Sequence, residues 1–132
     1  MAFEFNHNQQ DRDFTSTVAI AQAGANSAIF DLEQTIGGDI DKLVFEVVAP
    51  ASAGITDTKV VTYTFKDSAD GVTFAAVDPT IVTTQTATGA GIAAKTVRFR
   101  MPPGTRRYVR IEQTMTSSAG SPTGSFISRL LF

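Results

Sequence analysis

Strict alternation of apolar and polar side chains over three long segments is the feature of this sequence that most restricts its fold. In residues 58–67, Val61, Tyr63 and Phe65 occupy one face, and threonines lie between them. Residues 95–101 and 107–115 repeat the pattern. Because successive side chains of a β-strand point to opposite faces, this alternation predicts strands that each turn one face toward a core.

Shorter segments of similar character lie between turn-forming residues. Those rich in β-branched and aromatic residues are 15–21, 27–32, 42–48, 73–77, 80–84 and 126–132. Leu, Lys and Glu, which favour helices, are scarce, whereas Phe, Val, Ile and Thr, which favour strands, are abundant. Only residues 31–36 allow a single helical turn. The sequence therefore predicts an all-β fold, an antiparallel β-sandwich or jelly roll of about eight strands.

The polar run near the N-terminus predicts an extended arm ahead of the sandwich. Residues 6–13 are polar or charged, and Phe3 and Phe5 precede them. We expect residues 1–14 to form the arm and residues 15–132 to form one domain, because this length is ordinary for a single domain. Phe3 and Phe5 are candidates for docking on a partner protein, such as a neighbouring subunit.

Composition argues against several classes of protein. The chain has no cysteine, which excludes disulfides and thiolate metal sites. Its net charge of −2 argues against general capture of nucleic acid or of anionic membranes. No apolar run approaches the roughly 20 residues that span a bilayer, and the first residues lack the basic and apolar regions of a signal peptide. We expect neither a nucleic-acid partner nor a membrane partner.

The residues that catalysis or ion binding would need are missing or badly placed. His7 is the only histidine and lies in the predicted arm, with no serine elbow motif elsewhere. Most aspartates occupy turn positions, where such side chains bond the local backbone: Asp39, Asp57, Asp67, Asp70 and Asp78. The acidic turn before Gly71 has too short a series of oxygen ligands for calcium. The glycines at 89 and 91 lack the rest of a phosphate loop. We expect no enzymatic activity, no cofactor and no metal.

Positive charge is concentrated in the last third of the chain. Six of the eleven positive side chains, Lys95 and five arginines, lie within residues 95–110, whereas most acids precede residue 71. We therefore expect one edge of the domain to be positive and another negative. Because arginine pairs with carboxylates through two hydrogen bonds, the candidates for charged intersubunit contacts are Arg98, Arg100, Arg106, Arg107 and Arg110. A solvated strand face is the alternative. Aromatic residues do not interleave with these arginines, which argues against nucleic acid.

Three blocks of sequence follow one another in a characteristic order. The first is TYTFKDS at 62–68, followed by DGVTF at 70–74. The second is MPPG at 101–104, leading into RYVRI at 107–111, and the third is a glycine-flanked loop at 120–124 before a final apolar strand. From residue 42 onward the chain resembles the capsid cement, or decoration, proteins of tailed bacteriophages. The first block also occurs in carbohydrate-binding sandwiches.

The resemblance implies a jelly-roll subunit with no enzymatic activity and no cofactor. Such a protein is made in the host cytoplasm and binds the outer capsid surface of the virion as a homotrimer. There it cements neighbouring subunits of the major capsid protein and stabilises the head against the pressure of packaged DNA. The alternative is a carbohydrate-binding β-sandwich module, including one displayed on a virion. Because Trp is absent, Tyr63 and Tyr108 would have to supply its aromatic surface.

Overall fold

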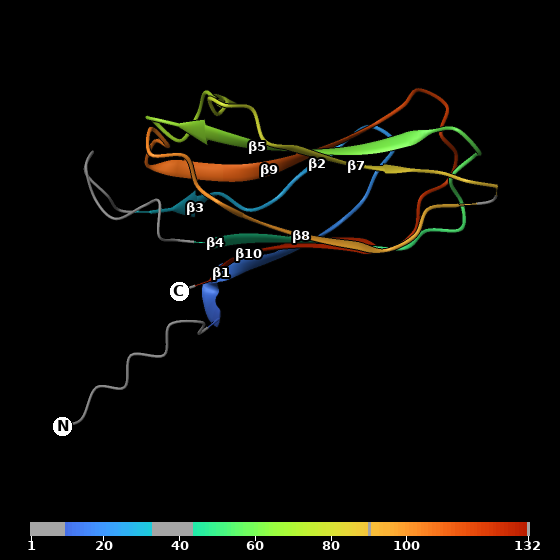
Figure 1. Cartoon of the computed structure of the whole chain (residues 1–132), viewed down its shortest axis with the longest axis horizontal. Helices are drawn as coiled ribbons and strands as arrows, with labels where there is room; N and C mark the ends of the chain where they lie inside the picture. The colour runs from blue at the N-terminus through green and yellow to red at the C-terminus, as the bar shows by residue number, and fades with distance from the viewer. Residues whose placement is uncertain (1–9, 33–43, 90, 132) are drawn as a thin grey trace.

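The computed structural model describes residues 10–32, 44–89 and 91–131, with side chains from residue 15 onward. Every strand in this part of the chain pairs antiparallel with its neighbours, and the strands form two sheets that lie face to face (Figure 1). The described residues contain no helix. The protein is therefore an all-β antiparallel sandwich, as the alternation predicted.

The first sheet has the strand order β1-β10-β4-β8. Its strands are β1 (Gln10–Ala19), β10 (Ser125–Leu131), β4 (Val44–Ala49) and β8 (Lys95–Arg100). The second sheet is built on the central pair β9 (Tyr108–Met115) and β5 (Val60–Ser68). Two short strands, β2 (Ala25–Asn26) and β3 (Phe30–Asp31), pair with β9, and β6 (Ala75–Ala76) and β7 (Val82–Thr86) pair with β5.

Each segment predicted as a strand contains or overlaps an observed one, but the boundary of the predicted arm differs. Strand β1 begins at Gln10, inside the segment 1–14 that the polar composition assigned to the arm. It pairs with β10 at Gln10↔Leu131, and after an irregularity the pairing continues from Thr15↔Arg129. Backbone pairing along this edge needs no apolar alternation, which is why the sequence pattern missed it. Phe3, Phe5 and His7 lie outside the described residues, as does most of the predicted helical turn.

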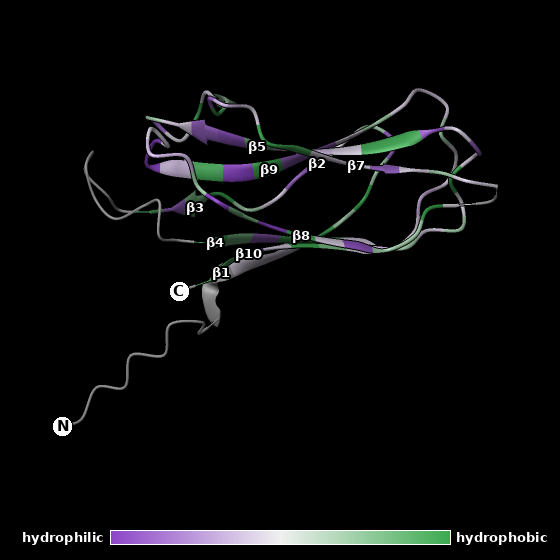
Figure 2. Ribbon diagram, viewed as in Figure 1, coloured by the Kyte–Doolittle hydropathy of each residue, from purple (hydrophilic) through white to green (hydrophobic). Residues whose placement is uncertain are grey.

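The core lies between the sheets and is dominated by aromatic rings. Hydrophobic and hydrophilic residues alternate along the central strands β5 and β9 (Figure 2). The Phe45 and Phe65 rings lie 5.2 Å apart, and the Tyr63 and Phe126 rings lie 5.4 Å apart. The inward faces predicted for β5 and β9 are confirmed, because Val61, Tyr63 and Phe65, together with Val109 and Ile111, are all buried. Each fully buried aromatic ring of this kind contributes about 1.5–3 kcal/mol to stability.

The two ends of the sandwich carry different loops. At one end, here called the charged end, β3, β5 and β8 finish and β9 starts; its charged side chains include Asp31, Asp67, Asp70, Arg106 and Arg107. At the other, here called the neutral end, lie loops 20–24, 50–59, 87–94 and 116–124. These four loops consist largely of Gly, Ala, Ser and Thr.

Candidate protein-interaction surfaces

The most elaborate polar contact joins the turn before β9 to the end of β5. The Asp67 carboxylate accepts hydrogen bonds from the backbone N–H of Arg106 at 2.9 Å, from its Nε at 3.1 Å and from its Nη2 at 2.8 Å. Arg106 Nη2 also donates to the Asp67 carbonyl at 3.1 Å. The Asp67 side chain is only 6% exposed, whereas that of Arg106 is 44% exposed. Arg106 therefore closes the loop onto its own chain.

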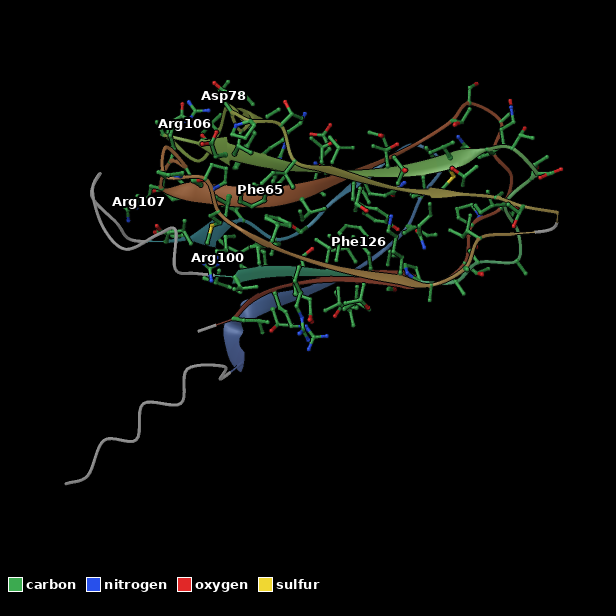
Figure 3. All side chains as sticks on the ribbon, in the orientation of Figure 1. Phe65, Asp78, Arg100, Arg106, Arg107 and Phe126 are labelled. Carbon is green, nitrogen blue, oxygen red and sulfur yellow. The ribbon has the colours of Figure 1, made fainter. Side chains whose placement is uncertain are left out.

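Arg107, the next residue, forms a second pair at the charged end. Its Nε and Nη2 donate to the two carboxylate oxygens of Asp31 at 2.7 and 2.9 Å, and its guanidinium lies 5.0 Å from the centre of the Tyr108 ring. Both partners are exposed enough to be screened by salt. Figure 3 shows Arg100, Arg106 and Arg107 gathered at this end of the molecule.

A third group of charges lies on the outer face of the second sheet. Glu112 lies between two cations, with Lys66 Nζ at 3.0 Å and Arg110 Nη2 at 3.7 Å from its Oε2 atom. The Arg110 guanidinium lies 4.1 Å from the centre of the Phe74 ring. Residues 66 and 110 are directly opposite each other in the β5–β9 register. The glutamate offsets the repulsion between them.

The outer face of the first sheet carries a buried glutamate shared by two arginines. Glu46 on β4 is opposite Arg98 on β8 and opposite Arg129 on β10. Each arginine contacts one oxygen of the carboxylate, and the Glu46 side chain is only 6% exposed, while that of Arg98 is 65% exposed. Arg100, two residues further along β8, is exposed and forms no ion pair within the described residues.

These contacts correct the expected separation of charge. The acids come from early in the sequence and the arginines from late, but folding sets them beside one another. Strand register places Glu46 opposite Arg98, and loop closure brings Asp67 to Arg106 and Asp31 to Arg107. Four of the five candidate arginines, 98, 106, 107 and 110, thus have carboxylate neighbours within their own chain. Arg98 and Arg100 are both exposed and lie on the same strand, β8.

An opening in the core lies between the edge strands β7 and β8. An apolar cavity of about 50 Å³ is bounded there by Phe65, Ile81, Val82, Val97 and Phe99, among others. Val82 is 47% exposed, so the cavity wall is also part of the surface. Lys95 Nζ donates to the Thr84 carbonyl at 3.2 Å, which links the two strands at one point. The described residues thus form a concave apolar feature at this edge.

Sequence reasoning missed two buried glutamines that connect loops of the neutral end. Gln85 accepts a hydrogen bond from the Tyr63 hydroxyl at 3.0 Å and donates to the carbonyls of Pro50 and Ala93 at 3.0 and 2.7 Å. Gln113 exchanges two bonds with the backbone of Ala21. Their signal is a long amide at an inward position of a strand, where an apolar residue is the usual choice.

The side chains considered for calcium and for sugar binding make contacts within their own chain. The described residues contain no group of three His, Cys, Asp or Glu side chains that could hold a metal ion. Asp70, considered for calcium, accepts hydrogen bonds from the backbone of Val72 and Thr73 and from the Ser68 hydroxyl. Tyr63 is 1% exposed, so its ring offers no platform for a sugar. No helix in the described part of the chain is long and apolar enough to cross a membrane.

Comparison with other proteins adds no family assignment. The sequence matches no protein-family model, and no curated protein matches it. In the described part of the chain, the fold and its surfaces define an antiparallel β-sandwich with paired charges on both outer faces and an apolar cavity at the β7–β8 edge. Any functional assignment has to be argued from these surfaces.

Proposed function

We propose that this chain is a virion structural protein, a cement protein that binds the outer capsid surface as a homotrimer and holds neighbouring major capsid protein subunits together. The strand order carries the proposal. If β2 with β3, and β6 with β7, each count as one interrupted strand, one sheet contains the first, eighth, third and sixth strands. The other contains the second, seventh, fourth and fifth. Counted in this way, the order supports an eight-stranded jelly roll, an architecture of viral capsid domains and also of lectins.

The surfaces suit a load-bearing part. Loops of the neutral end are joined to one another by backbone bridges at Ser52↔Ile92 and Ile55↔Gly120, which gives this end a fixed shape. The charged end is closed by the Asp67–Arg106 contact. In the proposed trimer we expect Arg98 and Arg100 to meet a neighbouring subunit, because the Arg98 side chain is 65% exposed and the exposed Arg100 forms no ion pair with the described residues. The proposed role of Phe3 and Phe5 concerns residues outside the described part.

The test is the mass of the purified protein in solution, followed by binding to undecorated capsids. We expect light scattering to give about three times the 14.0 kDa chain mass, or a monomer that trimerises only on the shell. We expect saturable binding to undecorated shells, and decorated shells should survive higher temperature than bare ones. Failure to bind any shell, from a panel of tailed-phage procapsids and expanded heads, would refute the proposal.

A matched pair of variants tests the arginine contacts. Arg98→Gln with Arg100→Gln removes the two exposed arginine charges of β8, whereas Lys59→Gln removes a positive charge from a loop of the neutral end that carries none of the candidate arginines. We expect the first variant to weaken assembly or shell binding and the second to leave both unchanged. Far-UV circular dichroism confirms that each variant is folded. Equal behaviour of the two variants would show that the β8 arginines make no intersubunit contact.

A further inference from the structure

Strand β8 is an edge strand with an accessible backbone. It pairs with β4 on one side, and within the described residues no strand pairs with it on the other. Strand β7 is similarly placed on the second sheet, beyond β5. In Figure 1, β7 and β8 lie at the same side of the sandwich, one in each layer. A row of unpaired N–H and C=O groups along such an edge is a template for one more strand.

The side chains of β8 divide this edge into two chemically different rows. Val97 and Phe99 point inward and line the apolar cavity of about 50 Å³, together with the half-exposed Val82 of β7. Arg98 and Arg100 point to the opposite face, where both are exposed. An additional strand would alternate in the same way, because its side chains also change face at each residue.

Charge on the arginine row is incompletely neutralised. Glu46 is the acid that contacts Arg98, and it is shared with Arg129. Arg100 forms no ion pair within the described residues. Among the side chains that the structure describes, three arginines and one glutamate therefore leave this face positive. Directly opposite side chains on paired strands lie about 4.5–5.5 Å apart, close enough for a carboxylate on an added strand to pair with each arginine.

We propose that the β8 edge binds an extended segment of a partner protein in which acidic and apolar side chains alternate. The main chain of the segment adds to the first sheet beside β8. Its acidic residues face Arg98 and Arg100, and one small aliphatic side chain enters the cavity beside Val97 and Phe99. A cavity of about 50 Å³ has room for a small aliphatic side chain and none for an aromatic ring. This binding mode does not depend on the proposed virion role.

Titration of the ¹⁵N-labelled protein with two synthetic peptides tests the proposal. One peptide alternates Val and Glu over seven residues, and the other carries Lys in place of each Glu. At low salt we expect the Glu peptide to shift the amide signals of Lys95–Arg100 and of Val82, and to bind about tenfold more tightly than the Lys peptide. Equal binding of both peptides, or shifts confined to the other edge strand β1, would overturn the proposal.

Variants of the protein separate the two rows. Arg98→Gln with Arg100→Gln should reduce the preference for the Glu peptide to about twofold or less, while Thr83→Phe, opposite the inward-facing Tyr63, should weaken binding of the Glu peptide by filling the cavity. Arg107→Gln, at the charged end, serves as the control that leaves binding unchanged. A preference that persists in the double variant would refute the role of these arginines. The comparison of peptides on the unaltered protein stands even if a variant fails to fold.

Discussion

At the neutral end of the sandwich the loops are joined mainly by backbone hydrogen bonds and by the amides of Gln85 and Gln113, whereas at the charged end side-chain ion pairs join them. Gly54 accepts a hydrogen bond from the Ser121 backbone at 3.2 Å, and the Ala119 carbonyl accepts one from Thr56 at 2.7 Å. At the charged end, the corresponding closure is the contact between Asp67 and Arg106, in which side-chain atoms supply most of the bonds.

The difference shows two ways in which a sequence can specify a closed loop. Backbone closure needs the absence of a side chain at a few positions, so a single added methyl group disrupts it. Ion-pair closure needs two complementary side chains, so either one can be removed alone and the loss depends on burial. The neutral end should therefore be sensitive to sterics and insensitive to salt or pH, and the charged end should show the reverse.

The largest effect is expected for Gly54→Ala. A Cβ atom at this position would lie 1.9 Å from the Ser121 carbonyl oxygen, which belongs to the backbone and cannot swing away. The loops would have to separate, so we expect the free energy of unfolding to fall by about 3 kcal/mol and the Tm by about 10 °C. Urea unfolding and differential scanning calorimetry measure both quantities.

Two other glycines provide matched controls for this variant. Gly89 has a positive φ of 72° but nothing within 4 Å of an added Cβ, so Gly89→Ala should cost only about 1 kcal/mol. Gly104 also has nothing within 4 Å and no positive φ, so Gly104→Ala should leave stability unchanged or raise it by about 0.5 kcal/mol. If Gly54→Ala were no worse than Gly104→Ala, close backbone contact would not be what holds the neutral end.

The next effect in size is expected for Asp67→Ala. The variant leaves the Arg106 guanidinium and backbone N–H without their acceptor, and because Asp67 is 6% exposed we expect a loss of about 2 kcal/mol. A double-mutant cycle with Arg106→Ala isolates the interaction, since the double variant should be little less stable than Asp67→Ala alone. If the double variant lost as much stability as the two single variants together, the Asp67–Arg106 pair would not be what closes this end.

The strands could be predicted from the sequence because their side-chain alternation is local. Val61, Tyr63 and Phe65 mark one buried face whatever pairs with β5. By contrast, the polar start of β1 shows no alternation, and the two-residue strand β2 is too short to carry a pattern.

The arginines of the candidate surfaces could also be located from the sequence, but their partners could not. Glu46 meets Arg98 only because β4 and β8 pair in one particular register, and residue type does not encode that register. The expectation of separate positive and negative edges failed for this reason. The cavity between β7 and β8 depends on how two non-adjacent segments leave an edge open, which no local pattern records.

We expect acid to lower the free energy of unfolding by protonating Asp70 at the charged end. This loss should be smaller than that caused by Asp67→Ala. Hydrogen bonds from the backbone of Thr73 and Val72 and from Ser68 lower the pKa of Asp70 from 3.8 to about 2. Because the folded-state pKa is the lower one, the carboxylate stabilises the fold above about pH 4, and this contribution is lost as the pH falls toward 2. Asp70→Asn should therefore show a shallower loss of stability between these pH values, measured by urea unfolding.

A matched variant controls for the removal of one negative charge. Asp78 also lies in an exposed turn of the same face, and Asp78→Asn removes the same charge without touching the hydrogen bonds of Asp70. We expect this control to follow the unaltered protein from pH 5 to pH 2. If both variants changed the loss of stability between pH 5 and pH 2 equally, the change in overall charge would explain the effect. The hydrogen bonds of Asp70 within the turn would then not be its cause.

The smallest effect is expected for the exposed pair of Arg107 and Asp31. Their side chains are 47% and 36% exposed, so water and salt screen the attraction even though two bonds of 2.7 and 2.9 Å connect them. We expect Arg107→Ala to lower the free energy of unfolding by about 0.5 kcal/mol at low ionic strength, and by less in 1 M NaCl. The same salt series on Asp67→Ala should leave most of the loss in place, because that carboxylate is buried. A loss at Arg107 as large as that at Asp67 would mean that burial does not set the strength of the charged end.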